Sequence, residues 1–219
     1  HLSAAALLFA LMRRASVQPW IATAAGVVFI FLGSGRANLG SAFQVTFSGA
    51  LAFGLAHLLL SDHEGFDRRD VGGLICGFGA VLCSGIGVVM VAVVGAAVLV
   101  RRGWQAALAH TAPLAAMYAL WQLLYGDEAI SVPSPTVRQV AAFSGWALWD
   151  SVIGYSQVKV GAALLLILLL IGFARVARGL AGGGTARGRY AGPAAMAGGS
   201  LLLVVVAGVG RASFTPIGS

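Results

Sequence analysis

The sequence has little charge, and acidic residues are especially few. Charged side chains make up 10% of its 219 residues and hydrophobic ones 59%, with a mean hydropathy of +0.91. Soluble domains carry about 25% charged residues, so this composition excludes an ordinary soluble domain. Only 7 residues are Asp or Glu against 14 Lys or Arg, for a net charge of +7. The basic residues lie mainly in links between apolar runs, as on the cytoplasmic side of membrane proteins, so we expect membrane lipid and no nucleic acid as a partner.

Cysteine and catalytic motifs are also scarce. The two cysteines, Cys76 and Cys83, lie on one helix face but too far apart along the helix to form a disulfide. No CxxC, HExxH, EF-hand or Ser/His/Asp pattern occurs, and the apolar runs carry no acids in the spacing of a proton relay. The sequence patterns therefore identify no metal ligands and no cofactor.

Apolar runs long enough to cross a bilayer recur along most of the chain. About 20 apolar residues cross a hydrocarbon core of roughly 30 Å as a helix. We therefore predict an all-α fold, a polytopic bundle of transmembrane helices in the plasma membrane. Because the chain opens at His1 inside an apolar run and ends soon after the last one, we expect a fragment of a larger protein. The expected spans are 2–12, 20–33, 42–60, 73–100, 106–125, 157–177 and 191–210, with an amphipathic helix at 137–155.

The run from 73 to 100 is too long for one simple crossing. Its roughly 28 residues would form a helix of about 42 Å. The sequence Cys-Ser-Gly-Ile-Gly at 83–87 interrupts it, and small residues of this kind let a membrane helix bend or unwind. We predict two short helices that meet near 84–87 in a hairpin that does not fully cross. A single, steeply tilted helix is the alternative.

The distribution of positive charge distinguishes two topologies, which differ in whether 73–100 and 137–155 cross the membrane. If 73–100 is a hairpin and 137–155 lies on the outer side, ten basic residues face the cytoplasm and four face outward. If both segments cross fully, the split is nine against five, so the hairpin is preferred. Both arrangements place Arg36 and Arg211 outside. In the preferred one the inner residues are Arg13, Arg14, Arg68, Arg69, Arg101, Arg102, Arg175, Arg178, Arg187 and Arg189.

Polar groups near the expected outer helix ends are the candidate binding residues. The short loop at 33–44 is rich in small residues, which let backbone approach a ligand, and its Arg36 can pair with a phosphate. The alternative is an ordinary loop in which Asn38 or Ser41 caps the next helix. Asp150 lies in the amphipathic helix, and an ionised group at membrane depth is costly and often functional.

Aromatic and histidine residues allow two interpretations each. Trp146 and Trp149 fit an interfacial anchor, with a sugar-stacking platform as the alternative. His57 and His110 lie in apolar helices, where a hydrogen-bonded packing role is favoured over metal ligation. His1 opens the first helix on the expected outer side, where it could belong to a site completed by upstream residues.

Several short motifs follow one another in a characteristic order. They are His1-Leu2 opening a helix that ends in Arg13-Arg14, Asn-x-x-x-Ala-Phe-Gln at 38–44, Arg68-Arg69-Asp70, Ser84-Gly85-Ile86-Gly87, Arg101-Arg102 and Trp121-x-x-x-Tyr125-Gly126. This order resembles that of large actinobacterial polytopic membrane proteins similar to GT-C type glycosyltransferases. That class includes protein O-mannosyltransferases and the aminoarabinose transferase of lipid A. The resemblance covers most of the chain.

The resemblance implies transfer of a sugar from a polyprenyl-phosphate donor on the outer face. The catalytic acid or metal ligand of that class lies in the first outer loop, here upstream of His1, so a divalent metal remains compatible with the class. The residues it implies for donor or acceptor binding are Arg36, Asn38 and Gln44, although Ala37 and Ser41 replace an acid and a Trp that the class often has. Two alternatives stay open: a transporter or flippase segment that uses the broken run, and a non-catalytic membrane scaffold.

Overall fold

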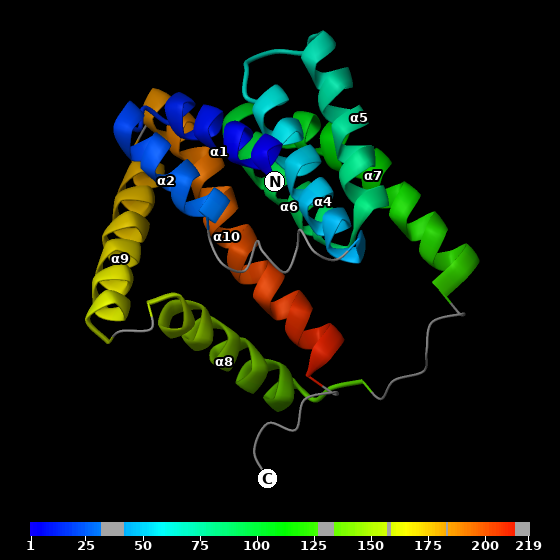
Figure 1. Ribbon diagram of the computed structural model, residues 1–219. Helices are drawn as coiled ribbons and strands as arrows, with labels where there is room; N and C mark the ends of the chain where they lie inside the picture. Colours follow the sequence, from blue (N-terminus) through cyan, green and yellow to red (C-terminus); the bar gives the residue numbers. More distant parts are fainter. Residues whose placement is uncertain (32–41, 127–133, 157–158, 183, 213–219) are drawn as a thin grey trace.

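The computed structural model of the chain describes residues 1–31, 42–126, 134–156, 159–182 and 184–212, and these residues contain helices and no strand (Figure 1). The all-α prediction is confirmed. The helices are α1 (Leu2–Arg14), α2 (Pro19–Phe31), α4 (Ala42–Leu60), α5 (Arg68–Cys83), α6 (Ile86–Arg102), α7 (Trp104–Tyr125), α8 (Val137–Ser156), α9 (Lys159–Ala181) and α10 (Thr185–Arg211).

Helix α6 is the centre of the bundle. It packs against α4, α5, α7 and α10. Its Val94 and Val98 are almost fully buried and form an apolar cluster with Leu58 of α4. Leu55 of α4 forms a second cluster with Met90 of α6. Branched side chains in contact on several sides gain dispersion energy from each neighbour, and this gain persists when the surroundings are lipid.

The break predicted in the run 73–100 is present. Helix α5 ends at Cys83 and α6 begins at Ile86. At the turn, the Ile86 amide donates to Ser84 Oγ at 3.1 Å. Gly87 is required because a Cβ there would collide with the carbonyl group of Ala80 on the facing helix. The two helices therefore cross closely and turn back on each other, so that the start of α5 lies beside the end of α6.

Helices α8, α9 and α10 pack on one another at the side of the bundle. Within the described residues, Gly161–Ala181 and Arg187–Arg211 are long and apolar enough to cross a membrane, while the apolar stretches Pro19–Ile30 and Val45–Leu60 are shorter. Only the last two of the expected spans therefore meet the length and composition of a crossing helix. The break explains why the expected span 73–100 is not among them, because it divides this run into helices of 16 and 17 residues.

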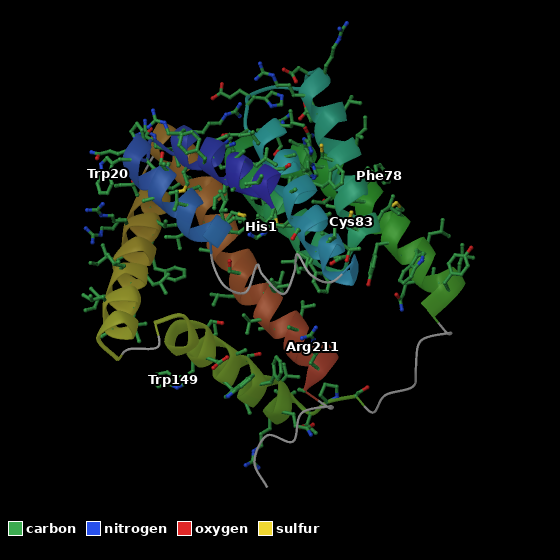
Figure 2. All side chains as sticks on the ribbon, viewed as in Figure 1. His1, Trp20, Phe78, Cys83, Trp149 and Arg211 are labelled. Carbon is green, nitrogen blue, oxygen red and sulfur yellow. The ribbon has the colours of Figure 1, made fainter. Side chains whose placement is uncertain are left out.

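Helix α8 lies across the far end of α9 and α10, apart from the α4–α7 group (Figure 1). Its Trp149 is 65% exposed and projects away from the other helices (Figure 2). On the same helix Phe143 is buried, and its ring lies at a tilt to that of Trp146, which is 54% exposed. Both tryptophans are thus directed to the surroundings, whether those are lipid or water.

Candidate functional site

Several helix ends meet at one end of the bundle, which we call the arginine-rich end. It comprises the end of α1, the link 61–67 after α4, the start of α5, the end of α6 and the start of α10. Arg14 of α1 donates to Leu59 O at 2.8 Å and to Asp62 O at 3.2 Å. Arg101 of α6 donates to Gly188 O of α10 at 2.9 Å. Arginine side chains thus tie together helices that are distant in the sequence.

A cavity of about 800 Å³ opens among α1, α4, α6 and α10 at the arginine-rich end. Its walls combine two kinds of side chain. The apolar residues are Leu8, Leu11, Met12, Val17, Leu58, Val100 and Met196. The charged or titratable residues are Arg14, Asp62, His63, Glu64, Arg101, Arg187 and Arg189. An apolar interior with a mostly cationic rim suits a ligand that has a hydrocarbon part and a negatively charged part.

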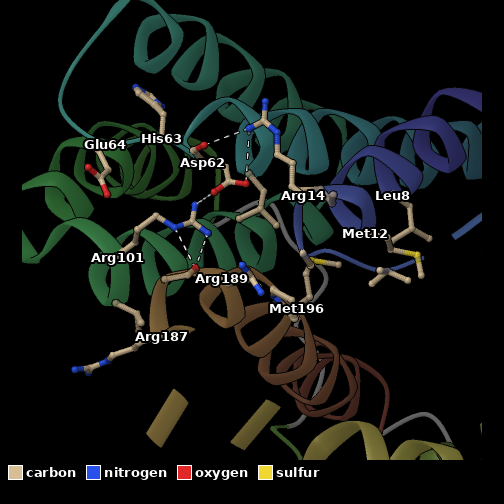
Figure 3. Close-up of a pocket in the computed structure, with 18 of the residues that line it drawn as sticks. Leu8, Met12, Arg14, Asp62, His63, Glu64, Arg101, Arg187, Arg189 and Met196 are labelled. Atoms are coloured by element: carbon tan, nitrogen blue, oxygen red, sulfur yellow. Dashed lines mark hydrogen bonds and ion pairs between the residues drawn. The ribbon is translucent and has the colours of Figure 1, made fainter. Parts of the chain in front are cut away.

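The cationic rim is only partly neutralised. Arg14 and Arg101 converge on the carboxylate of Asp62 from two different helices (Figure 3), the former at 3.7 Å. Within the described part of the chain, no acid forms an ion pair with Arg187 or Arg189, and both are exposed. These two guanidinium groups are available to an anion, and Arg binds phosphate through a planar fork of donors.

The start of α5 is set by a local sequence pattern. Asp67 is the N-cap residue, and its Oδ1 accepts from the Arg69 amide at 2.7 Å. Asp70, three residues later, accepts from the Asp67 amide through Oδ2 at 2.8 Å. This reciprocal pair is a capping box, here with Asp in both positions, which satisfies backbone donors that the first helical turn leaves open. It also fixes both carboxylates beside the link.

Asp70 is the centre of a buried polar network. Arg102 Nη1 and His110 Nε2 lie 2.7 and 2.8 Å from its Oδ1, and the Arg102 side chain is only 4% exposed. Because a carboxylate only accepts, His110 donates through Nε2, and its neutral ring accepts at Nδ1 from His57 Nε2, 3.0 Å away. Burial alone would raise the pKa of Asp70, but hydrogen bonds from Arg102, the Asp67 amide and His110 hold that pKa well below its usual range.

His63 lies next to this network, but its ring forms no hydrogen bond with it. Its Nε2 is 3.1 Å from Asp67 Oδ1 and 3.4 Å from Asp70 Oδ2. Neither contact has the direction of a hydrogen bond, and both ring nitrogens are buried without a hydrogen-bond partner. One ligand atom from each of His63, Asp67 and Asp70 lies within 4.8 Å of the others, so the three residues could hold a metal ion.

The residues predicted from the sequence lie elsewhere. His1 stacks on Phe29 and makes a 3.0 Å hydrogen bond with the Phe29 carbonyl, at the end of α1 away from Arg14. Asp150 is exposed on α8, near neither His1 nor the cavity. Arg36 and Asn38 lie outside the described residues, as does the side chain of Gln44 at the start of α4.

Sequence reasoning missed the cluster at the arginine-rich end. His57 and His110 have the hydrogen-bonded packing role predicted for them, but their link to Asp70 was not foreseen. A signal for it existed: Asp70 opens an apolar helix whose hairpin partner ends in arginines, and a hairpin brings those ends together. The spacing of His63, Asp67 and Asp70 also places three ligand-type side chains within a short stretch.

Comparison with known proteins adds no relative: no protein-family model, curated protein or solved structure matches this chain.

Proposed function

We propose that this protein is a multi-pass protein of the plasma membrane that binds an anionic amphiphile, a lipid carrying a phosphate, in the cavity at the arginine-rich end. The observation that carries the proposal is the cavity itself, with apolar walls and exposed arginines at its rim.

Helix α9 supports placement in a membrane. Within its apolar stretch Gly161–Ala181, the most apolar 18-residue window has no part buried inside the protein. Large side chains such as Leu168 and Leu170 are 65% and 60% exposed. The core helix of a soluble protein would be covered, whereas a helix in contact with lipid needs no cover because hydrocarbon surrounds it.

The positions of the arginines support one orientation of the protein in the membrane. Contacts bring together the basic ends of α1, α6 and α10 and the start of α5. Helix α7 leaves from this end and, with 22 residues, extends about 33 Å toward the opposite one. Lys and Arg are enriched on the cytoplasmic side of membrane proteins, so the arginine-rich end is assigned to the cytoplasm. The cavity then opens at the level of lipid headgroups.

The chemistry of the cavity selects the ligand class. Because Arg187 and Arg189 are exposed, solvent screens their charge, and each contact with a phosphate contributes about 0.2–1 kcal/mol. Together they favour a phosphate over an alcohol by up to about 2 kcal/mol. The apolar walls supply contact for an acyl or prenyl chain. A small inorganic anion would leave that apolar surface uncovered, and an uncharged lipid would leave the arginines without a partner.

The narrower proposal of a GT-C-like glycosyltransferase is compatible with this ligand class. A polyprenyl-phosphate sugar is an anionic amphiphile with a long apolar chain. The two proposals differ in the membrane face, because the resemblance places sugar transfer outside and the cavity lies at the end assigned to the cytoplasm. Binding at this cavity therefore concerns a lipid phosphate at the inner face, and the outer site would be formed by other residues.

A transporter or flippase is the second candidate, and the helix break between α5 and α6 favours it. Transporters bind substrates where interrupted helices expose backbone groups. The break lies at the opposite end of the hairpin from Arg102, so it is separate from the cavity. Movement of lipid between the two leaflets would distinguish this function from binding alone.

The test compares a polyprenyl phosphate with the matched polyprenol, each titrated into the purified chain in nanodiscs of zwitterionic lipid. We expect the phosphate to bind at least about tenfold more tightly, which corresponds to about 1.4 kcal/mol. Combined Arg187→Gln and Arg189→Gln substitutions should remove this preference. Arg138→Gln on α8 removes one charge far from the cavity and should preserve it. Equal affinity of the wild type for both lipids would refute the proposal.

A further inference from the structure

We propose that His63, Asp67 and Asp70 form a binding site for one divalent transition-metal ion of the Zn²⁺ type. The site is independent of the proposed lipid binding, although His63 also lines the cavity. Three protein ligands and one open position are the usual composition of an accessible zinc site.

The distances among the ligand atoms are compatible with a single bound metal ion. Ligand atoms about 2.0–2.1 Å from Zn²⁺ lie about 3.3–3.4 Å apart along the edge of a tetrahedron. His63 Nε2 is 3.1 Å from Asp67 Oδ1 and 3.4 Å from Asp70 Oδ2. All three atoms are within 4.8 Å of one another. An ion placed among them could therefore contact the three with small adjustments.

The state of His63 is the independent observation that points to a ligand. Its side chain is only 10% exposed. Both of its ring nitrogens are buried and lack a hydrogen-bond partner, although two carboxylate oxygens lie within ion-pair distance. A buried polar atom without a partner is costly, so native structures rarely leave one unexplained. A metal ion on Nε2 would satisfy that atom without requiring the direction of an N–H···O bond.

The two oxygens of Asp70 differ in their main partners. Oδ1 receives the short bonds from Arg102 and His110, at 2.7 and 2.8 Å. Oδ2 faces His63 and otherwise accepts from the Asp67 amide, with a longer 3.4 Å contact to Arg102 Nη2. Asp70 could therefore bind the ion through Oδ2, while hydrogen bonds from Arg102 and His110 to Oδ1 hold the carboxylate in place, as is usual for metal ligands.

The donor set and the exposure indicate the type of metal. One imidazole nitrogen with two carboxylates suits Zn²⁺ and similar ions, whereas Mg²⁺ prefers oxygen ligands alone. Two carboxylates bring two negative charges. Arg102 offsets that of Asp70, and the exposed Arg69 pairs with Asp67 through its other oxygen, Oδ2, at 3.8 Å. The Asp67 side chain is 47% exposed, so the ion can enter from solvent and a water molecule can take the fourth position.

The test is calorimetric titration of Zn²⁺ into the full chain, purified in detergent with its affinity tag removed. We expect one bound ion per chain and no measurable binding of Mg²⁺. Changes in outer-shell groups reduce metal affinity about 10–100-fold, so loss of a ligand should cost at least that much. The variants are His63→Ala and Asp67→Asn, and the latter keeps an N-cap residue for α5. Circular dichroism of each variant checks that it folds.

Two matched controls separate this site from adventitious binding. Glu64→Gln removes an exposed acid from the same link, and His1→Ala removes the histidine at the amino terminus. Both should retain the affinity of the wild type. Visible absorption of bound Co²⁺ should report a tetrahedral site in the wild type and in both controls. The inference is overturned if the wild type binds no Zn²⁺, if folded His63→Ala binds it as tightly as the wild type, or if the controls lose it equally.

Discussion

The Asp70→Asn substitution tests whether the buried network holds the arginine-rich end together. It keeps the size of the side chain but removes the charge that faces Arg102 at 2.7 Å. Because the Arg102 side chain is 4% exposed, water cannot replace the lost partner. Removing one member of a buried ion pair costs about 3–5 kcal/mol. Asn retains one acceptor oxygen, so we expect a loss of about 3 kcal/mol.

Such a loss is a large part of the total stability, which is about 5–15 kcal/mol for a typical protein. For a chain of about 150–250 residues it corresponds to a fall in Tm of roughly 6–12 °C. The chain supplies its own probe, because Cys76 and Cys83 are free thiols that are partly buried. A dye that becomes fluorescent on reaction with thiols reports their exposure as the protein is heated in detergent.

The control for this measurement is Glu64→Gln, an exposed neighbour whose loss should change stability by less than about 0.5 kcal/mol. The double variant Asp70→Asn/Arg102→Met removes both charges and should recover part of the lost stability, because no unpaired charge remains buried. A Tm for Asp70→Asn equal to that of Glu64→Gln would refute the reasoning. So would a double variant less stable than Asp70→Asn alone.

Two further substitutions test the packing of the bundle by the same thermal assay. Gly87→Ala forces a Cβ against the carbonyl of Ala80 and should cost about 1–3 kcal/mol, while Gly85→Ala, where a Cβ meets nothing within 4 Å, should cost little. Leu114→Ala removes a side chain that is 1% exposed and should cost about 2–5 kcal/mol, against little change for Leu120→Ala, which is 57% exposed on the same helix. Equal losses within either pair would contradict the packing described.

Local sequence signals were sufficient to predict most of the helices. Long apolar runs predicted an all-α chain, and the small residues around Ser84 and Gly85 predicted the break between α5 and α6. The last helix begins earlier than expected, at Thr185 in place of residue 191. The glycine-rich, basic stretch before residue 191 is typical of a link, yet Arg is a good helix former and the helix continues through Arg187 and Arg189.

The candidate site could not be predicted in the same way, because its contacts join distant segments. Asp70 and Arg102 are 32 residues apart, and His57 and His110 are 53 apart. Periodicity indicates which face of a helix is apolar but not which helices become neighbours. The candidate residues predicted from the sequence lie near the expected outer helix ends, whereas the buried polar groups lie at the arginine-rich end, which we propose faces the cytoplasm.

The most direct test of the account is which membrane face the arginine-rich end occupies. Single cysteines are introduced as Glu64→Cys in the link and Tyr125→Cys at the end of α7, in a chain with Cys76→Ser and Cys83→Ser. A membrane-impermeant maleimide is then applied to intact spheroplasts. We expect Tyr125→Cys to react at once and Glu64→Cys to react only after permeabilisation. Equal labelling of both without permeabilisation, or release of the protein from membranes by carbonate washing, would contradict the account.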